Sequence, residues 1–178
     1  MTVQSYKEGL KGLVKQLGEM LPKDKLDIFN HDAEQLGKSY PSPLKLGKGD
    51  KAPLFSLPNA AGENVDLENI LKNGKVVLTF YRGVWCPYCN LQLKMYQQIL
   101  PEIKAAGAQL IAVSPMNPDN SVRMIETNEL KFEVLSDAGS KIATKYTTVF
   151  ENPQTSIQAM SELGYDFHGF YDDNSAQL

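Results

Sequence analysis

The sequence predicts an α/β domain built around a parallel β-sheet. Three runs rich in β-branched and aromatic residues have the composition of strands: 75–81, 108–113 and 132–135. Segments with helical periodicity follow them: 87–106, 119–129 and 140–146. Strands that alternate with helices indicate a parallel sheet with helical connections, and we expect the first strand to be buried on both faces. The chain has 178 residues, 42% of them hydrophobic, which is enough for one domain with its own core.

Two predicted helices precede this domain. Apolar residues recur at three- and four-residue spacing over residues 3–20, with lysines and glutamates between them, as in an amphipathic helix. Pro22 suits the first turn of a second helix with a similar stripe. We therefore expect a helical extension at 1–38, a linker at 39–50 and the main domain at 51–178. The stripe would pack against the main domain or against a second copy in a homodimer.

Three small elements are expected before the first long strand. Residues 52–58 read as a short strand, and 59–64, with Ala-Ala-Gly at the centre, read as a turn. Residues 65–71 read as a short helix that the following Asn73-Gly74 pair ends.

Composition and charge exclude several classes of function. The formal net charge is −3 and no segment carries a basic block, so we expect no nucleic-acid partner and no binding to an anionic membrane surface. The N-terminus lacks the pattern of a secretory signal, and no stretch approaches the roughly 18 apolar residues of a membrane span. A cytoplasmic protein is the expectation. In a reducing compartment two cysteines separated by two residues indicate redox or metal chemistry rather than a structural disulfide.

The candidate site is the Cys86-Pro87-Tyr88-Cys89 run, which lies where the predicted strand ends and the next helix begins. Pro87 fits the first helical position, which makes Cys86 the N-cap and Cys89 the third helical residue. Their Cα atoms would lie about 5 Å apart, inside the range of about 4.4–6.8 Å that a disulfide spans. At the positive end of the helix Cys86 should be the activated thiolate, and Cys89 should be less exposed. Such a pair cycles between dithiol and disulfide without a cofactor.

Three other interpretations of the two cysteines compete with this one. A zinc site needs four ligands as a rule, and only His31 and His168, far apart in the sequence, could add to the cysteines, so we expect no metal. Two unreactive buried cysteines would fit a helix interior better than a start marked by proline. A Cys–His hydrolase has no supporting signal beyond the single residues.

Residues 45–150 resemble the peroxiredoxin-like branch of the alkyl hydroperoxide reductase and thiol-specific antioxidant family, in the thioredoxin-fold superfamily. Four segments carry the resemblance: Gly47-Lys48-Gly49-Asp50-Lys51-Ala52-Pro53, Phe55-Ser56-Leu57-Pro58, Phe80-Tyr81 and Trp85-Cys86-Pro87-Tyr88-Cys89. Glutaredoxins also carry Cys-Pro-Tyr-Cys, and tryptophan before the first cysteine resembles thioredoxins. The resemblance implies a peroxidase for hydrogen or organic peroxides, whose disulfide is reduced by a thioredoxin or glutathione system. A disulfide reductase acting on protein or glutathione mixed disulfides is the second function, and a non-catalytic interaction module is a third.

The sequence departs from the usual peroxiredoxin pattern at the site. A gapless alignment places Arg82 on the family's proline, Cys86 on its threonine or serine and Cys89 on its peroxidatic cysteine. The alignment and the helix argument therefore nominate different nucleophiles, and we favour Cys86 because it should be the more exposed sulfur. Many peroxiredoxins supply an arginine late in the chain, and this sequence has none after Arg123.

Three neighbours of the cysteines have supporting roles in this interpretation, each with an alternative. Arg82 could orient a peroxide or steady a thiolate, or it could be a surface arginine at a strand end. Trp85 and Tyr88 would form an apolar collar where a partner docks, or they would simply pack.

The C-terminal part raises a further expectation. Members of the family continue into antiparallel strands led by a cis-proline, whereas residues 153–178 contain no β-rich run. We therefore expect a thioredoxin-like domain that lacks its C-terminal strands. The strand at 75–81 would then have one flank unpaired or paired with another chain, and the Cys86 pocket would be open.

Overall fold

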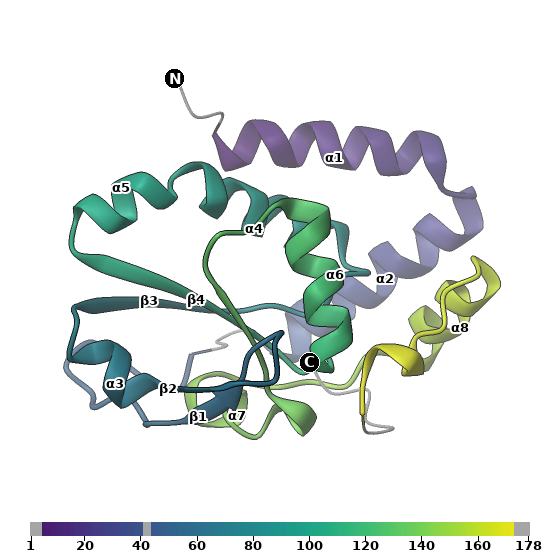
Figure 1. Ribbon diagram of the computed structural model, residues 1–178. Coiled ribbons are helices and arrows are strands. Elements are labelled where there is room, and N and C mark those ends of the chain that lie inside the picture. The colour runs from purple at the N-terminus through teal and green to yellow at the C-terminus, as the bar shows by residue number, and fades with distance from the viewer. Residues whose placement is uncertain (1–4, 41–43, 173–178) are drawn as a thin grey trace.

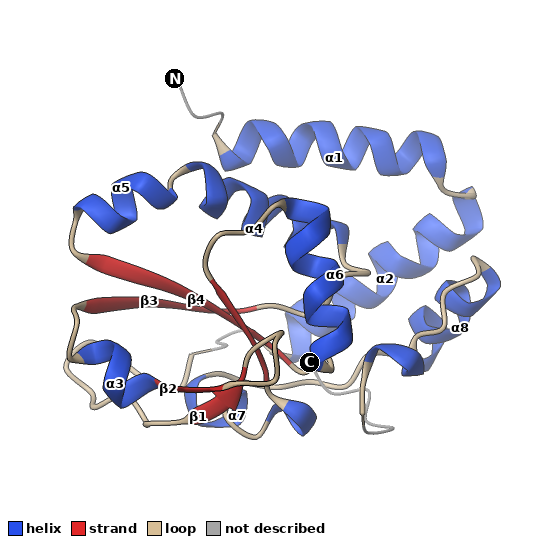
Figure 2. Cartoon of the chain, in the orientation of Figure 1, coloured by secondary structure: helices blue, strands red, loops and turns tan. Residues whose placement is uncertain are grey.

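The structure is a computed structural model, and it describes residues 5–40 and 44–172. Figure 2 shows a central β-sheet with helices on both sides. The strands are β3 (Lys75–Phe80), β4 (Ala108–Ser114) and β5 (Glu133–Ser136), and they form a parallel sheet in the order β3-β4-β5. The predicted α/β class and the three long strands are therefore confirmed. A separate antiparallel hairpin joins β1 (Ser56–Pro58) to β2 (Asn64–Asp66).

The sheet has a hydrophobic core on each face, and Figure 1 shows that elements of the chain cover both faces. Ala112 belongs to one core, whereas its neighbours Ile111 and Val113 belong to the other, because successive side chains of a strand point to opposite faces. The Ala112 face is covered by α4 (Pro87–Gln98), α6 (Pro118–Asn128) and α8 (Gln154–Glu162). The opposite face is covered by the hairpin, α3 (Leu67–Leu71) and α7 (Ala143–Tyr146). The two short 3-10 helices are η1 (Ala138–Ser140) and η2 (His168–Phe170).

The long helix predicted at 87–106 is in fact two helices. It ends as α4 at Gln98, and α5 (Leu100–Ala105) follows after Ile99, whose φ and ψ of −97° and 6° are not helical. Pro101 explains the break, since proline has no N–H to donate to a carbonyl four residues earlier and its ring clashes with that carbonyl. The predicted helix at 65–71 was also too long, because Val65 pairs with Leu57 in the hairpin. The strand predicted at 52–58 shortens to β1.

The two N-terminal helices form as predicted and lie against the main domain. They are α1 (Tyr6–Met20), which packs on α4, and α2 (Lys23–Ser39), which packs on α8. Asp32 of α2 is buried, and its carboxylate accepts hydrogen bonds of 2.6 Å each from the hydroxyls of Thr155 and Ser156. No residue of α1 is buried, so α2 is the more firmly attached of the two. The linker predicted at 39–50 lies partly outside the described residues.

One edge of the sheet is open. In the described part of the chain β3 pairs only with β4, and no strand follows β5 before Asp172. Val77 of β3 is 39% exposed, so the expectation that this strand is buried on both faces was wrong. The expected unpaired edge of the same strand is found. The backbone groups of this edge are free to pair with an added strand.

Candidate active site

The Cys86-Pro87-Tyr88-Cys89 run begins α4 as the sequence predicts. Cys86 is the N-cap, with extended φ and ψ of −88° and 108°, and Pro87 occupies the first turn. The Sγ atom of Cys86 accepts a hydrogen bond of 3.3 Å from the backbone N–H of Cys89. The sulfur therefore takes the place that a serine or aspartate oxygen has in ordinary N-caps. An anionic sulfur at this position is stabilised by the helix N-terminus.

The loop before α4 is held by an asparagine pair that the sequence did not reveal. The Asn90 side-chain amide donates to the carbonyl oxygens of Val84, at 2.7 Å, and Cys86, at 2.9 Å. Its own oxygen accepts a 2.7 Å hydrogen bond from the side-chain amide of Asn128, at the end of α6. These bonds fix the loop between the sheet and two helices. No motif identifies them, because the two residues lie 38 positions apart.

Arg82 lies directly beside the cysteines, so the alternative of a surface arginine was wrong. Its Nη2 atom donates to the Cys86 sulfur at 3.2 Å. Its backbone N–H lies 3.5 Å from the Cys89 sulfur. The guanidinium carbon also lies 5.2 Å from the centre of the Trp85 ring, in a cation–π contact. One fixed positive charge thus faces both sulfurs.

The two thiols have pKa values shifted in opposite directions. A hydrogen bond from the Cys89 thiol and the positive charge of Arg82 outweigh burial and lower the pKa of Cys86 to about 6. The same bond to Cys86 and burial raise the pKa of Cys89 well above its ordinary value. Near neutral pH the pair therefore carries its negative charge on Cys86 and its proton on Cys89. This is the direction that the helix start predicts.

The expected exposure of the site was wrong. Cys86 has 0% of its surface exposed and Cys89 has 8%, so Cys86 is not the more accessible sulfur. The two lie in one core cluster with Phe167 and Tyr171, and both Trp85 and Tyr88 pack against this cluster. The segment after α8 packs against the loop before α4, where the Trp85 indole N–H donates to the Tyr171 hydroxyl, and no sequence pattern predicted this contact. Of the two interpretations of Trp85 and Tyr88, a docking collar or simple packing, the structure shows the packing.

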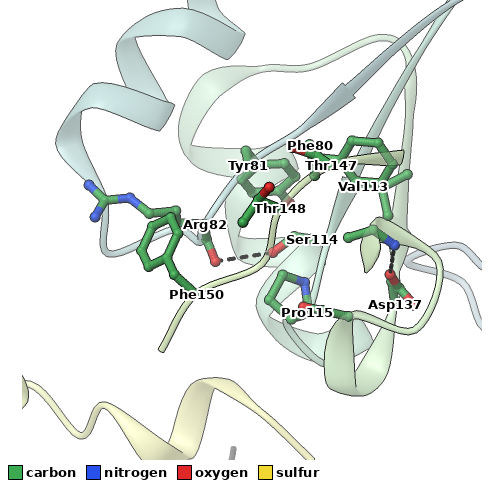
Figure 3. A pocket seen from close by; sticks show the side chains of 12 residues that line it. Phe80, Tyr81, Arg82, Val113, Ser114, Pro115, Asp137, Thr147, Thr148 and Phe150 are labelled. Carbon is green, nitrogen blue, oxygen red and sulfur yellow. Dashed lines mark hydrogen bonds between the residues drawn. The ribbon is translucent and has the colours of Figure 1, made fainter. Parts of the chain in front are cut away.

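A separate cavity of about 200 Å³ lies at the carboxyl ends of β3 and β4 (Figure 3). Its wall includes Tyr81, Arg82 and Ser114, but neither cysteine. The Arg82 carbonyl oxygen accepts a hydrogen bond of 3.3 Å from the Ser114 hydroxyl, while the guanidinium extends away from Ser114 and Asp137 (Figure 3). Arg82 therefore belongs both to the wall of this cavity and to the sulfur site.

The remaining sequence candidates lie elsewhere. His31 and His168 are both exposed, and across residues 5–40 and 44–172 no group of three or more His, Cys, Asp and Glu side chains could hold a metal ion. The helices of the same part of the chain are all too short or too polar to cross a membrane. Three methionines are buried in the core: Met116, Met124 and Met160.

The fold and the dithiol define a class of protein with a thioredoxin-like α/β domain. A solved structure described as peroxidoxin BcpB from Mycobacterium tuberculosis superposes with a TM-score of 0.53 at 26% identity, covering 55% of this chain and 64% of that one. The model of the AhpC/TSA family matches residues 48–166. The chain belongs to the AhpC/TSA family, as the sequence motifs indicated.

Curated relatives include both peroxidases and disulfide oxidoreductases. Peroxiredoxin Bcp of Escherichia coli is 32% identical over 105 residues, which cover 59% of this chain and 65% of the relative. The thiol-disulfide oxidoreductase ResA of Bacillus cereus is 28% identical over 104 residues, which cover 58% of this chain and 59% of the relative. The matched part of the chain therefore spans less than two thirds of the length of either relative.

Proposed function

We propose that this chain is a thiol peroxidase in which Cys86 is the nucleophile and Cys89 the resolving cysteine. The observation that carries the proposal is the separation of charge in the dithiol. Cys86 combines a lowered pKa with a 3.2 Å contact to Arg82, and Cys89 holds the proton. A thiolate, not a thiol, attacks a peroxide, so the two sulfurs have different roles before any substrate arrives.

The reaction balances with these two sulfurs and one hydroperoxide. The Cys86 thiolate attacks the terminal oxygen of the hydroperoxide, the O–O bond breaks, and the departing alkoxide or hydroxide takes a proton and leaves as alcohol or water. Cys86 is then a sulfenic acid. The Cys89 thiol attacks it and gives up its proton, the S–O bond breaks, and the departing hydroxide takes that proton and leaves as water as the Cys86–Cys89 disulfide forms. In this proposal Arg82, whose guanidinium contacts the Cys86 sulfur, holds the peroxide oxygen as charge develops on it.

The gapless family alignment assigns the attack to Cys89 instead. Exposure no longer separates the two candidates, because both sulfurs are buried. The pKa values do separate them, since only the pKa of Cys86 is lowered. The proposal therefore rests on the charge distribution of the pair and on the Arg82 contact.

A thioredoxin or glutathione system would reduce the disulfide in turn, in the cytoplasm, with the protein acting as a monomer or a homodimer. The alternative is a thiol-disulfide reductase that uses the same sulfurs on protein or glutathione mixed disulfides. The ResA relative and the Cys-Pro-Tyr-Cys run support this second function. A non-catalytic interaction module would not explain why the pKa values of the two thiols shift in opposite directions.

A coupled turnover assay separates the two enzymatic functions. The protein is supplied with NADPH and either thioredoxin with its reductase or glutathione with its reductase, and then with hydrogen peroxide or a glutathionylated peptide. We expect NADPH consumption with peroxide that Cys86→Ser abolishes, and Met20→Ala, an exposed position on α1, serves as the control. Turnover of the peptide without turnover of peroxide would replace the proposal with the reductase function.

A further inference from the structure

Three aromatic side chains lie in, or pack against, the core cluster that contains both cysteines: Trp85, Phe167 and Tyr171, which we call the aromatic cap. The indole N–H of Trp85 donates a 2.9 Å hydrogen bond to the Tyr171 hydroxyl. The Phe167 ring centre lies 5.4 Å from that of Trp85 and 5.3 Å from that of Tyr171. Phe167 is 2% exposed and Tyr171 is 6% exposed, so the cap is packed rather than loosely laid on the surface.

Arg82 and Gly83 also fix the position of the Trp85 ring. The Arg82 guanidinium lies against its ring, and Gly83 approaches it so closely that a Cβ there would be 2.5 Å from the indole nitrogen. Any other residue at 83 would displace the ring. The indole therefore sits between the cation that contacts the Cys86 sulfur and the two aromatic rings of the chain segment after α8.

That segment is anchored to α6 rather than free to swing. The backbone N–H of Asn117 donates to the Phe170 carbonyl at 3.1 Å, and the Asn120 side-chain amide donates to the Gly169 carbonyl at 3.1 Å. Arg123 adds a cation–π contact to the Phe170 ring, at 5.8 Å. The cap is thus held at both ends, by α6 on one side and by the Arg82 loop on the other.

We propose that the aromatic cap is the specificity element of the site, which admits small hydroperoxides such as hydrogen peroxide to Cys86 and excludes bulky tertiary and aromatic ones. The inference rests on the proposed function. Its basis is the complete burial of the Cys86 sulfur among side chains whose positions are fixed by hydrogen bonds and ring contacts. Because the Cys86 sulfur has no exposed surface, every oxidant reaches the thiolate only when the packing around it opens. Hydrogen peroxide needs a smaller opening than a hydroperoxide with a bulky carbon group, which would have to displace a ring before its terminal oxygen reached the thiolate.

The chemistry of the step is the same for every substrate, so size is what the cap discriminates. In each case the Cys86 thiolate takes one oxygen and the O–O bond breaks, while the remaining alkoxide or hydroxide leaves with one proton. Specificity is then the ratio of rate constants for two oxidants, and pockets that discriminate by shape typically achieve about tenfold or more.

The test measures single-turnover oxidation of the reduced protein by hydrogen peroxide, tert-butyl hydroperoxide and cumene hydroperoxide. Each rate constant is divided by that for free cysteine thiolate, which removes the intrinsic reactivity of the oxidant. We expect the wild type to favour hydrogen peroxide over cumene hydroperoxide by about tenfold or more, and Tyr171→Ala to reduce this preference severalfold. Tyr171→Phe, which removes only the hydrogen bond to Trp85, should lie between them.

Tyr165→Ala is the matched control, because Tyr165 is 48% exposed and belongs to neither the cap nor the dithiol. The dependence of the oxidation rate on pH is recorded for every variant. A smaller side chain in the aromatic cap should change the preference for hydrogen peroxide and leave the midpoint of the pH dependence unchanged. Equal normalised rates for all three oxidants in the wild type would overturn the inference, as would an unchanged preference in a folded Tyr171→Ala protein. Failure of every oxidant to react would instead overturn the proposed function.

Discussion

Replacing Arg82 by methionine should raise the pKa of Cys86 and move the pH dependence of its reactivity upward. Methionine keeps an unbranched apolar chain against Trp85 and removes the positive charge. Arg82 Nη2 lies 3.2 Å from the Cys86 sulfur. At that distance two unit charges interact by about 5 kcal/mol at an effective dielectric constant of 20 and by about 1.3 kcal/mol in bulk water.

The expected effect lies between these two figures and nearer the lower one, because Arg82 is only partly buried whereas the Cys86 sulfur is fully buried. One pKa unit corresponds to about 1.4 kcal/mol, so the pKa of Cys86 should rise by about one to two units. With a starting pKa of about 6, most Cys86 is thiolate at pH 7. The thiolate fraction at pH 7 should then fall to about a half for a shift of one unit and to about a tenth for two.

The assay is alkylation with iodoacetamide across a range of pH, with the labelled cysteine identified by mass spectrometry. The rate for Cys86 should increase as pH rises through the pKa, with a midpoint near 6 in the wild type and between about 7 and 8 in Arg82→Met. Arg82→Lys should give an intermediate midpoint. The control is Arg123→Met, which removes the other arginine of the sequence from its contact with the Phe170 ring. An unchanged midpoint in folded Arg82→Met would refute the electrostatic role assigned to Arg82.

Three further predictions concern the framework that positions the site, and each is measured by equilibrium unfolding in urea. Leu93→Ala should lower the free energy of unfolding by about 2–5 kcal/mol, because Leu93 of α4 is fully buried, and a loss below about 1 kcal/mol would show a loosely packed core. Gly74→Ala should lower the free energy of unfolding more than Gly62→Ala does. Both glycines have positive φ, but only at Gly74 would the new Cβ lie 2.6 Å from a backbone oxygen. Equal losses would contradict that contact. Asp32→Ala should lower the free energy of unfolding by about 1–3 kcal/mol, because it leaves two hydroxyls of α8 without their acceptor. It should also speed proteolysis of the N-terminal helices, and unchanged proteolysis would contradict the anchoring of α2.

Local patterns predicted the elements that position the dithiol. The β-branched run before the site formed β3, and Pro87 at the helix start was sufficient to place Cys86 at the N-cap. Pro101 could have predicted the break between α4 and α5, because proline cannot continue a helix. The prediction missed it because helical periodicity continues on both sides of this residue. The hairpin strand β2 was missed because its pairing with β1 is set by tertiary contact rather than by composition.

The environment of the sulfurs was less predictable, since it depends on contacts between distant segments. No feature of the sequence near Cys86 predicts that Tyr171 will form a hydrogen bond with Trp85 or that Cys86 will share a core cluster with Tyr171. The same holds for Asn128, which reaches Asn90 from the end of α6. Arg82 was singled out as a candidate, but its direct contact with the Cys86 sulfur required the geometry of the loop.

The central claim is the division of roles between Cys86 and Cys89, and mass spectrometry after one equivalent of hydrogen peroxide tests it most directly. The wild type should lose two hydrogens as the disulfide forms, because Cys89 lies within one helical turn of Cys86. Cys89→Ser should gain one oxygen on Cys86, and Cys86→Ser should stay unmodified. If Cys86→Ser instead gains oxygen on Cys89 faster than Cys89→Ser gains it on Cys86, the roles are reversed and the account of the site is wrong.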